Sequence, residues 1–410
     1  MRATALAVVA VVAAFLGGSL ALVAGSVTGW RDGGTTTVLV PVSDGAAEDS
    51  VPAVDRPETA KPLPGNDFSP STIYRARSGG VVTIVALFGE PAADGEGGAS
   101  QGSGFVVSRK GYILTNSHVI TTAGEDSPSE SAEAAGTVYV EFSDGDRVRA
   151  EIVGWDIFDD VGLLKVDPAE HDLEPVPLGD SSRVVVGEPV AAIGSPFGQE
   201  TSLSVGVVAA TERSIASLTS EYSLVDAIQT DAPINRGNSG GPLFDARGRA
   251  IGVNAQIRSE SGNAEGVGFA VPINSARRSM SQLIATGEVR YAYVGITTQT
   301  VTPSLAERFD YGADRGAAVQ DVNLDTPAAG AGFRPGGSEQ VFEDITIKPG
   351  GDLIVAIDGE PVDSADDVVR AVTTRLPGEK LTFTVLRGDE RRTISVTLGT
   401  RPEIPPGSGR

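Results

Sequence analysis

Short, Val- and Ile-rich runs separated by turn residues dominate the chain between residues 81 and 255, and they constrain the fold most strongly. Such runs are typical of β-strands, and almost no helical pattern interrupts them. They cover residues 81–87, 104–107, 112–115, 138–142, 147–153, 162–166, 189–193, 204–209, 241–244 and 250–255. About ten strands in ~200 residues predict an all-β fold of two barrels. A helical pattern over Ser275–Ile284 closes this region.

Composition limits the kinds of chemistry that the chain can perform. Its 410 residues exceed one ordinary domain of ~150 residues. A net charge of −22 makes binding to a phosphate backbone unfavourable, so we expect no nucleic-acid function. Cysteine is absent, which excludes disulfides, thiolate metal sites and a cysteine nucleophile, and no motif indicates a metal or another cofactor. His118 and His171 are the only histidines.

The N-terminus carries an uncharged stretch from Ala3 to Trp30. It exceeds the ~20 apolar residues that a membrane-spanning helix needs and the ~7–15 of a secretory signal. We therefore expect a signal-anchor transmembrane helix over residues 1–30, with the rest of the chain outside the cytoplasm. The small residues Ser19-Leu20-Ala21 leave cleavage and secretion as the alternative.

Further composition changes divide the remaining chain. Six prolines between residues 41 and 70 indicate an extended, disordered linker over residues 31–70. We expect one domain over residues 71–288, beginning with a helix at Ser69-Pro70. A second domain over residues 289–400 is predicted to contain a helix capped by Ser364 and a final hairpin, and residues 401–410 to form a flexible tail. Residues 143–146 are interpreted as a hairpin turn, because they lack the later ligands of a calcium loop.

The segment Gly237-Asn238-Ser239-Gly240-Gly241 is the most informative motif. A serine becomes a nucleophile only when a base removes its proton and hydrogen-bond donors stabilise the resulting oxyanion. Flanking glycines allow a tight turn that aims backbone amides at one point. We therefore predict an oxyanion hole at Gly237, Asn238 and Ser239. A passive serine in a glycine-rich turn is the alternative.

A base and an orienting acid precede this serine. His118 follows a strand-like run, whereas His171 lies in an acidic loop and is the weaker candidate. Asp160 directly precedes an apolar run, where partial burial would let it orient a histidine. Spacing alone does not exclude Asp156 or Asp159.

The order of these residues along the chain discriminates between folds. An α/β-hydrolase would need its histidine after the serine, and no histidine follows Ser239. The order His118, Asp160, Ser239 on a β-rich background is the chymotrypsin arrangement.

Three segments resemble the catalytic blocks of the HtrA/Deg serine proteases: Thr115–Val119, Asp160–Val166 and Asn235–Leu243. Residues 101–105 and 268–272 are also similar, whereas Arg236 stands where the family usually has proline. The resemblance implies a chymotrypsin-like double β-barrel with His118 and Asp160 on the first barrel and Ser239 on the second. It further implies a homotrimeric serine endopeptidase that cleaves unfolded or damaged proteins in envelope quality control.

Substrate specificity can be predicted from the pocket that receives the side chain before the scissile bond, the S1 pocket. In the chymotrypsin fold the residue six before the nucleophile lies at its base. Here that residue is the uncharged Pro233. The resemblance places two walls around it, formed by Val253, Asn254, Ala255, Val267, Gly268 and Phe269. This lining predicts small or medium aliphatic side chains, provided that the neighbouring Asp231 does not turn inward.

The second domain resembles a PDZ domain. Tyr293-Val294-Gly295-Ile296 is similar to the carboxylate-binding loop and Ser364–Arg375 to the groove helix, and residues 336–348 look like an insertion. An exposed strand edge beside a helix binds an extended peptide by β-addition, so we expect peptide C-termini as ligands. The alternative function is a non-proteolytic peptide-binding chaperone or scaffold.

Overall fold

The computed structural model describes residues 68–89, 98–123, 132–195, 201–235, 237–255 and 267–404. The predicted N-terminal anchor, nearly all of the proline-rich linker and Arg236 lie outside these ranges. Within them, no helix has both the length and the hydropathy needed to cross a membrane.

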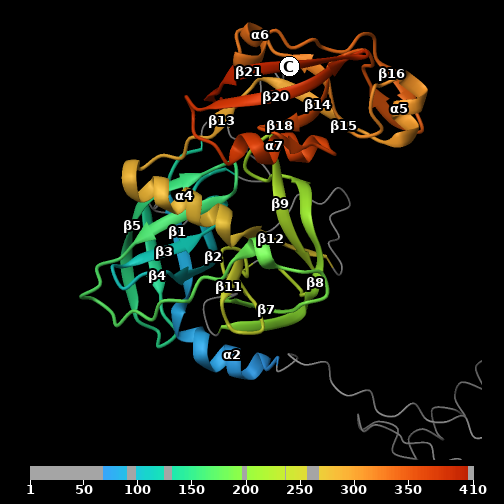
Figure 1. Cartoon of the computed structure of the whole chain (residues 1–410). Helices are drawn as coiled ribbons and strands as arrows, with labels where there is room; N and C mark the ends of the chain where they lie inside the picture. Colours follow the sequence, from blue (N-terminus) through green and yellow to red (C-terminus); the bar gives the residue numbers. More distant parts are fainter. Residues whose placement is uncertain are drawn as a thin grey trace, which may run out of the picture. The chain divides into compact units, whose positions relative to one another are not determined.

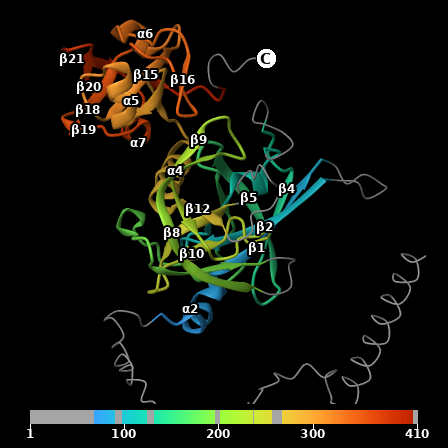
Figure 2. The ribbon, with the colours of Figure 1, turned by 90° about the vertical axis from the view of Figure 1, so that its right-hand side faces the viewer.

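Six antiparallel strands close the first barrel, in the order β1-β2-β3-β6-β5-β4 (Figures 1 and 2). The strands are β1 (Val81–Phe88), β2 (Gly98–Val106), β3 (Tyr112–Thr115), β4 (Thr137–Glu141), β5 (Arg147–Asp156) and β6 (Val161–Lys165). β2 begins six residues before the predicted strand 104–107, because Gly98–Ser100 also pair with β1. Residues 143–146 form the predicted hairpin turn between β4 and β5.

A second closed barrel has the strand order β10-β11-β12-β9-β8-β7. Its strands are β7 (Pro189–Gly194), β8 (Ser202–Ala216), β9 (Ser223–Thr230), β10 (Pro242–Phe244), β11 (Ala250–Ala255) and β12 (Gly268–Pro272). β9 is not among the predicted strands, and β8 ends seven residues beyond its predicted end. The predicted pair of barrels is nevertheless confirmed.

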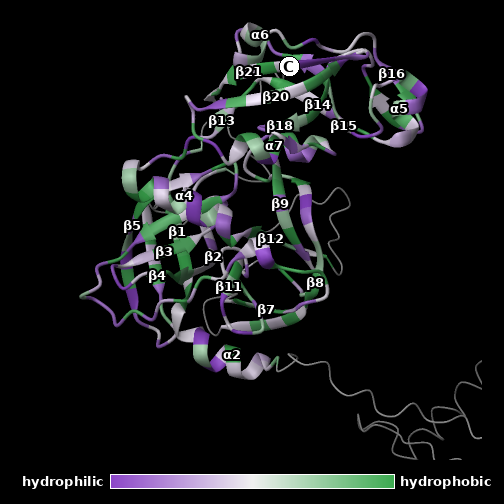
Figure 3. Ribbon diagram, in the orientation of Figure 1, coloured by the Kyte–Doolittle hydropathy of each residue, from purple (hydrophilic) through white to green (hydrophobic). Residues whose placement is uncertain are grey.

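The two barrels share one hydrophobic core. Phe105 and Leu114 of the first barrel and Ile193 and Phe244 of the second belong to the same buried cluster. Figure 3 shows that hydrophobic residues are frequent along the barrel strands. Burial of this shared core fixes the position of one barrel against the other, because apolar surface is removed from water only when both are in place.

Helices pack against the outside of the barrels. α2 (Pro70–Arg77) begins at the predicted Ser69-Pro70 step and buries Ile73. α4 (Ile273–Thr286) packs on strands of both barrels and ends at Gly287, whose positive φ of 76° suits glycine (Figure 1). The short α3 (Ser117–Ile120) follows β3 directly.

The C-terminal domain is a sheet with strand order β14-β15-β18-β20-β21, to which β19 adds beside β18. Two further strand pairs, β13 with β22 and β16 with β17, complete it. The strands are β13 (Ala292–Tyr293), β14 (Ile296–Val301), β15 (Gly316–Val322), β16 (Gln340–Phe342), β17 (Ile345–Ile347), β18 (Leu353–Ile357), β19 (Glu360–Pro361), β20 (Lys380–Arg387), β21 (Glu390–Thr397) and β22 (Gly399–Thr400). The helices are α5 (Pro303–Phe309), α6 (Pro327–Ala331) and α7 (Ala365–Thr373).

The helix cap and the final hairpin that the sequence predicts for this domain are present in the structure. Ser364 caps α7 through a reciprocal capping box with Asp367, which satisfies two free amides at the helix start. The predicted hairpin is β20–β21, and its alternating residues Leu381, Phe383 and Val385 are buried. The segment predicted as an insertion, residues 336–348, contains the β16–β17 hairpin.

Candidate active site

His118 and Asp160 meet in the first barrel. His118 Nδ1 lies 2.8 Å from Asp160 Oδ2, and the His118 backbone N–H donates to Asp160 Oδ1 at 3.1 Å. Asp160 is 4% exposed, so water competes little for its carboxylate. Because an ionised carboxylate only accepts hydrogen bonds, Nδ1 carries the proton and the imidazole presents Nε2 as a base.

Two polar residues where β3 passes into α3, Asn116 and Ser117, hold Asp160 in place. Ser117 Oγ donates to Asp160 Oδ1 at 2.8 Å, and Asn116 Nδ2 donates to the Asp160 backbone carbonyl at 2.8 Å. Both side chains are fully buried. Asp160 has a left-handed φ of 51°, which costs a non-glycine residue of order 1 kcal/mol. These contacts compensate for that strain and orient the carboxylate toward His118.

Ser239 lies in a tight turn of the second barrel. Gly237 and Gly240 have φ angles of 100° and 85°, which a side chain would disfavour. The Ser239 hydroxyl is buried and has no hydrogen-bond partner within the described ranges. In the same ranges the Gly237 and Ser239 backbone N–H groups donate to no acceptor, whereas the Asn238 N–H donates to the Asn235 carbonyl at 3.0 Å. Of the three residues predicted to form the oxyanion hole, two therefore have an amide available.

Ser103 of β2 is a functional candidate that sequence reasoning misses. Its backbone N–H donates to the Ser239 carbonyl at 2.8 Å, and its hydroxyl donates to the Gly237 carbonyl. Gly240 packs so closely that a Cβ there would lie 2.1 Å from the Ser103 carbonyl oxygen. Ser103 thus couples the first barrel to the turn that carries Ser239. The only sequence signal is its place in the segment 101–105 that resembles the family.

The rival candidates lie elsewhere. His171 stacks on Phe142 with ring centroids 3.7 Å apart, and its Nε2 lies 3.2 Å from Asp144 Oδ2 at the β4–β5 turn. Asp156 accepts hydrogen bonds from Ser279 and Tyr291, not from a histidine. The structure thus pairs His118 with Asp160 among the acids that spacing left open.

Burial changes the acidity of the two rival aspartates. Burial raises the pKa of Asp156, although four hydrogen bonds to its carboxylate oppose the shift. Burial, reinforced by repulsion from Asp156, raises the pKa of Asp159 to about 6. In the part of the chain that the structure describes, no group of three His, Asp or Glu side chains could hold a metal ion.

The residues predicted to line the S1 pocket are brought together only in part. β11 and β12 pair, so that Ala255 lies opposite Phe269. The backbone of Asn254 exchanges hydrogen bonds with Gly240 and Gly241, which places β11 beside the Ser239 turn.

Two of the predicted wall residues have no exposed surface that could contact a substrate side chain. Val253 and Asn254 are fully buried, since Val253 packs in the core and Asn254 Nδ2 donates to the Pro242 carbonyl. Val267 is exposed and Gly268 is buried against Ile234. Pro233 is exposed, and its carbonyl accepts from Ser204 Oγ at 2.8 Å.

Comparisons with known proteins agree with this geometry. Residues 102–253 match the trypsin-like peptidase domain and residues 292–398 match the PDZ domain. A solved structure described as the HtrA-type protease AlgW with tripeptide is 33% identical, with a TM-score of 0.66, and the likeness covers 83% of this chain and 100% of that one. The chain belongs to the HtrA-type serine protease family.

Curated HtrA-type relatives are longer than this chain. A probable periplasmic serine endoprotease DegP-like from Pseudomonas fulva is 39% identical over 76% of this chain and 60% of its own length. The protein of the same description from Halomonas elongata is 38% identical over 78% of this chain and 61% of its own length. The chain therefore spans about three fifths of the length of these relatives.

A groove of ≈ 420 Å³ lies between the C-terminal domain and the β8–β9 hairpin of the second barrel, since Ser214 and Val225 line it together with residues of β13, β14 and α7. The predicted carboxylate loop borders it, because Tyr293 ends β13 and Ile296 begins β14. Gly295 between them has a φ of 89°, and a Cβ there would lie 2.3 Å from the Thr326 side chain, so the loop requires glycine. Val368 and Val372 of α7 line the opposite side.

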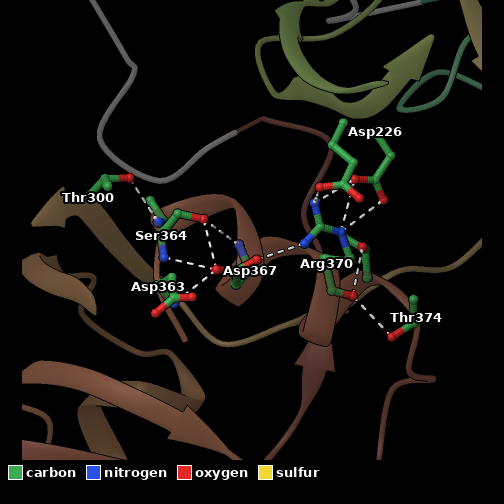
Figure 4. A network of polar contacts seen from close by, with 10 residues as sticks. Asp226, Thr300, Asp363, Ser364, Asp367, Arg370 and Thr374 are labelled. Carbon is green, nitrogen blue, oxygen red and sulfur yellow. Dashed lines mark hydrogen bonds and ion pairs between the residues drawn. The ribbon is translucent and has the colours of Figure 1, made fainter. Parts of the chain in front are cut away.

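Two strands of the second barrel also approach α7. Arg370 Nε and Nη2 both donate to Asp226 Oδ1 of β9, at 2.9 and 2.8 Å, while Nη1 donates to Asp367 at 2.7 Å (Figure 4). Glu212 of β8 lies 3.6 Å from Nη2. These acids raise the pKa of Arg370 above its usual value, with the hydrogen bond to Asp226 as the main cause. Figure 4 shows Arg370 extending from the helix toward the strand. No sequence signal identified this contact.

Proposed function

We propose that the chain is a serine endopeptidase in which Ser239 is the nucleophile. Ser239 Oγ attacks the scissile carbonyl carbon while His118 Nε2 accepts its proton. The amides of Gly237 and Ser239 stabilise the oxyanion. The tetrahedral intermediate then collapses, and the proton passes from His118 to the leaving amine. Water repeats the sequence to release the acyl group, and Asp160 keeps the imidazole in the required tautomer throughout.

The observation that carries this proposal is the buried 2.8 Å hydrogen bond between His118 Nδ1 and Asp160 Oδ2, in a fold whose other barrel presents Ser239. Ser239 is 4% exposed and adjoins two available amides. That combination provides a base, an orienting acid, a nucleophile and electrostatic stabilisation, which are the four parts that acyl transfer needs.

A serine-directed fluorophosphonate and an unfolded casein substrate test the proposal. The wild-type chain should be labelled at Ser239 and should cleave casein. Ser239→Ala should lose several orders of magnitude in rate with its fold retained. Ser281→Ala, which removes an exposed hydroxyl on α4, is the matched control. Rapid casein cleavage by purified Ser239→Ala would refute the assignment.

A non-proteolytic peptide-binding chaperone or scaffold is the alternative function, and the likeness to serine endoproteases does not favour it. The same fluorophosphonate separates the two candidates, since a scaffold without a working nucleophile would remain unlabelled while it still bound peptides. In our proposal the groove binds peptide C-termini, with the carboxylate held at Tyr293–Ile296.

The cellular setting is proposed from the relatives and the N-terminal sequence. We propose that the enzyme acts outside the cytoplasm on unfolded or damaged proteins, as a homotrimer anchored through residues 1–30. The relatives described as periplasmic support this location. We also propose that residues 71–288 form the protease domain, residues 289–400 the PDZ domain and residues 401–410 a tail. Intact mass spectrometry of the mature protein and analytical ultracentrifugation test the anchor and the trimer.

A further inference from the structure

The turn between β5 and β6 carries the candidate catalytic Asp160. The buried carboxylate of Asp156, four residues earlier, closes this turn. Asp156 is 1% exposed. Its Oδ1 accepts from the backbone N–H groups of Phe158 and Asp159, at 2.9 and 3.3 Å. Asp156 thus bends the chain into the turn that delivers Asp160 to His118. A shift of this carboxylate would move the whole turn, because two of its amides are bound there.

The other oxygen of Asp156 is held from outside the turn. Oδ2 accepts from Ser279 Oγ of α4 at 2.6 Å and from Tyr291 Oη at 2.7 Å. Tyr291 is 5% exposed and lies in the connector between α4 and β13. Phe158 of the turn packs edge-on against the Tyr291 ring, with centroids 5.2 Å apart. The connector into the C-terminal domain therefore contacts the turn through both a hydrogen bond and a ring.

The chain returns to the same place at the far end of the C-terminal domain. Sequence analysis assigns Arg401 to a flexible tail, but its backbone N–H donates to the Tyr291 carbonyl at 2.9 Å. Its guanidinium lies 5.3, 4.9 and 5.1 Å from the ring centroids of Phe158, Tyr222 and Tyr291. A cation over aromatic faces is attracted to each of them, so Arg401 holds the Tyr291 ring against Phe158.

We propose that Tyr291 is a positioning residue for the peptidase reaction: its hydroxyl fixes Asp156, Arg401 fixes its ring, and Asp156 in turn fixes the Ile157–Asp160 turn. The proposal rests on the proposed function. Asp160 needs this support because its left-handed backbone is strained and persists only where surrounding contacts determine it. Small displacements of a catalytic group cost large factors in rate.

A purely structural role for Tyr291 predicts a different outcome. It would lower the unfolding temperature and leave the turnover of folded enzyme unchanged. A positioning role lowers kcat with little change in KM, because it acts through Asp160 and His118 on the chemical step. It also shifts the acid limb of the pH profile. Tyr291, Ser279 and the turn amides stabilise the ionised Asp156, and Asp159, Arg278 of α4 and Arg401 are the charged groups nearby. Loss of the Tyr291 hydroxyl therefore favours protonation of Asp156 at higher pH.

The test compares the full-length chain with Tyr291→Phe, which removes one hydroxyl and keeps the ring. Tyr311→Phe removes another buried hydroxyl, one in the C-terminal domain, and is the matched control. For Tyr291→Phe we expect kcat on a short peptide and the fluorophosphonate labelling rate both to fall about tenfold, the size of one lost hydrogen bond to a charged group. KM should hold, and the acid limb should move to higher pH. Tyr311→Phe should match the wild type.

Ser279→Ala removes the second donor to the same oxygen and keeps the inference testable if Tyr291→Phe folds poorly. It should reproduce the kcat loss in milder form. Wild-type values of kcat, labelling rate and pH profile in folded Tyr291→Phe and Ser279→Ala would overturn the inference while leaving the proposed peptidase intact. A wild-type chain that neither cleaves nor becomes labelled would overturn the proposed function, and this inference with it.

Discussion

Asp226 of β9 has a left-handed φ of 62° at the point where its carboxylate receives two nitrogens of Arg370 from α7. Asp226, whose backbone is strained, and helix α7 are thereby linked by an ion pair with two hydrogen bonds. The side chains of Arg370 and Asp226 are about one third exposed, 33% and 32%, so water screens part of the attraction.

We expect a double-mutant cycle of Arg370→Ala and Asp226→Asn to give a coupling energy of about 1 kcal/mol, the upper range for a partly exposed pair with paired donors. Urea unfolding of the wild type, the two single variants and the double variant measures it. Strictly additive effects would show that the pair contributes nothing to stability. Asp366→Asn, on the same helix, is a control for the loss of one acidic charge.

Proteolysis should fall as the pH drops through ~6.5, where an ordinary imidazole gains its proton. The sign follows from the role of His118, because a base must be neutral to accept the Ser239 proton. A pH series with a peptide substrate measures the limb. His118→Ala should abolish activity, whereas His171→Ala, which loses only the stack on Phe142 and the contact with Asp144, should retain it. The opposite pattern would contradict the assignment.

Asp159→Asn should stabilise the fold above pH 6. The pKa of Asp159 is raised to about 6, above its ordinary value near ~3.9, so the folded chain binds more protons than the unfolded chain between these two values. The contribution of Asp159 to the free energy of unfolding is therefore fully present below pH ~4 and is lost as the pH rises through about 6. The variant should gain about 3 kcal/mol above that range.

Urea unfolding of wild type and Asp159→Asn between pH 4 and 8 measures this difference. Asp172→Asn, at an exposed position, controls for charge. Parallel stability curves for the wild type and Asp159→Asn would rule out a raised pKa at this position.

Cleavage should follow small or medium aliphatic residues. Asp231, two residues before Pro233, is exposed, and its Oδ1 accepts from the Val207 N–H of β8 at 2.6 Å. Pro233 carries no charge, so an Arg or Lys side chain would gain no ion pair from that residue and would be costly to bury beside it. Mass spectrometry of cleavage products from a denatured protein gives the profile. Predominant cutting after Arg or Lys would refute the pocket prediction.

Sequence patterns predicted the strands whose apolar residues are uninterrupted. The bounds of β3 and β11 match the expected ranges residue for residue. β9 was missed because Asp226 and Gln229 break its apolar pattern, and it is recognised as a strand only through its partners β8 and β12. Strand pairing is a tertiary property that local periodicity does not contain.

Some residues of the candidate site could likewise be predicted from the local sequence, whereas others could not. Ser239 and His118 could be inferred from local motif and scarcity. Asp160 was favoured over Asp156 and Asp159 because it adjoins a buried run. Ser103 could not be assigned a role, since its contacts with Gly237 and Ser239 exist only once the two barrels meet. Arg401 was placed in a loose tail because proline and glycine surround it, and its aromatic partners come from three distant segments.

The pairing of β13 with β22 sets Ala292 opposite Thr400. The points at which the chain enters and leaves the C-terminal domain are therefore about one strand spacing apart, ~4.8 Å. Close ends of this kind are the geometry at which one domain can be inserted into or exchanged within a chain without stretching the flanking segments. Tyr291, just before the first of these points, and Arg401, just after the second, would remain at the junction with the protease barrels.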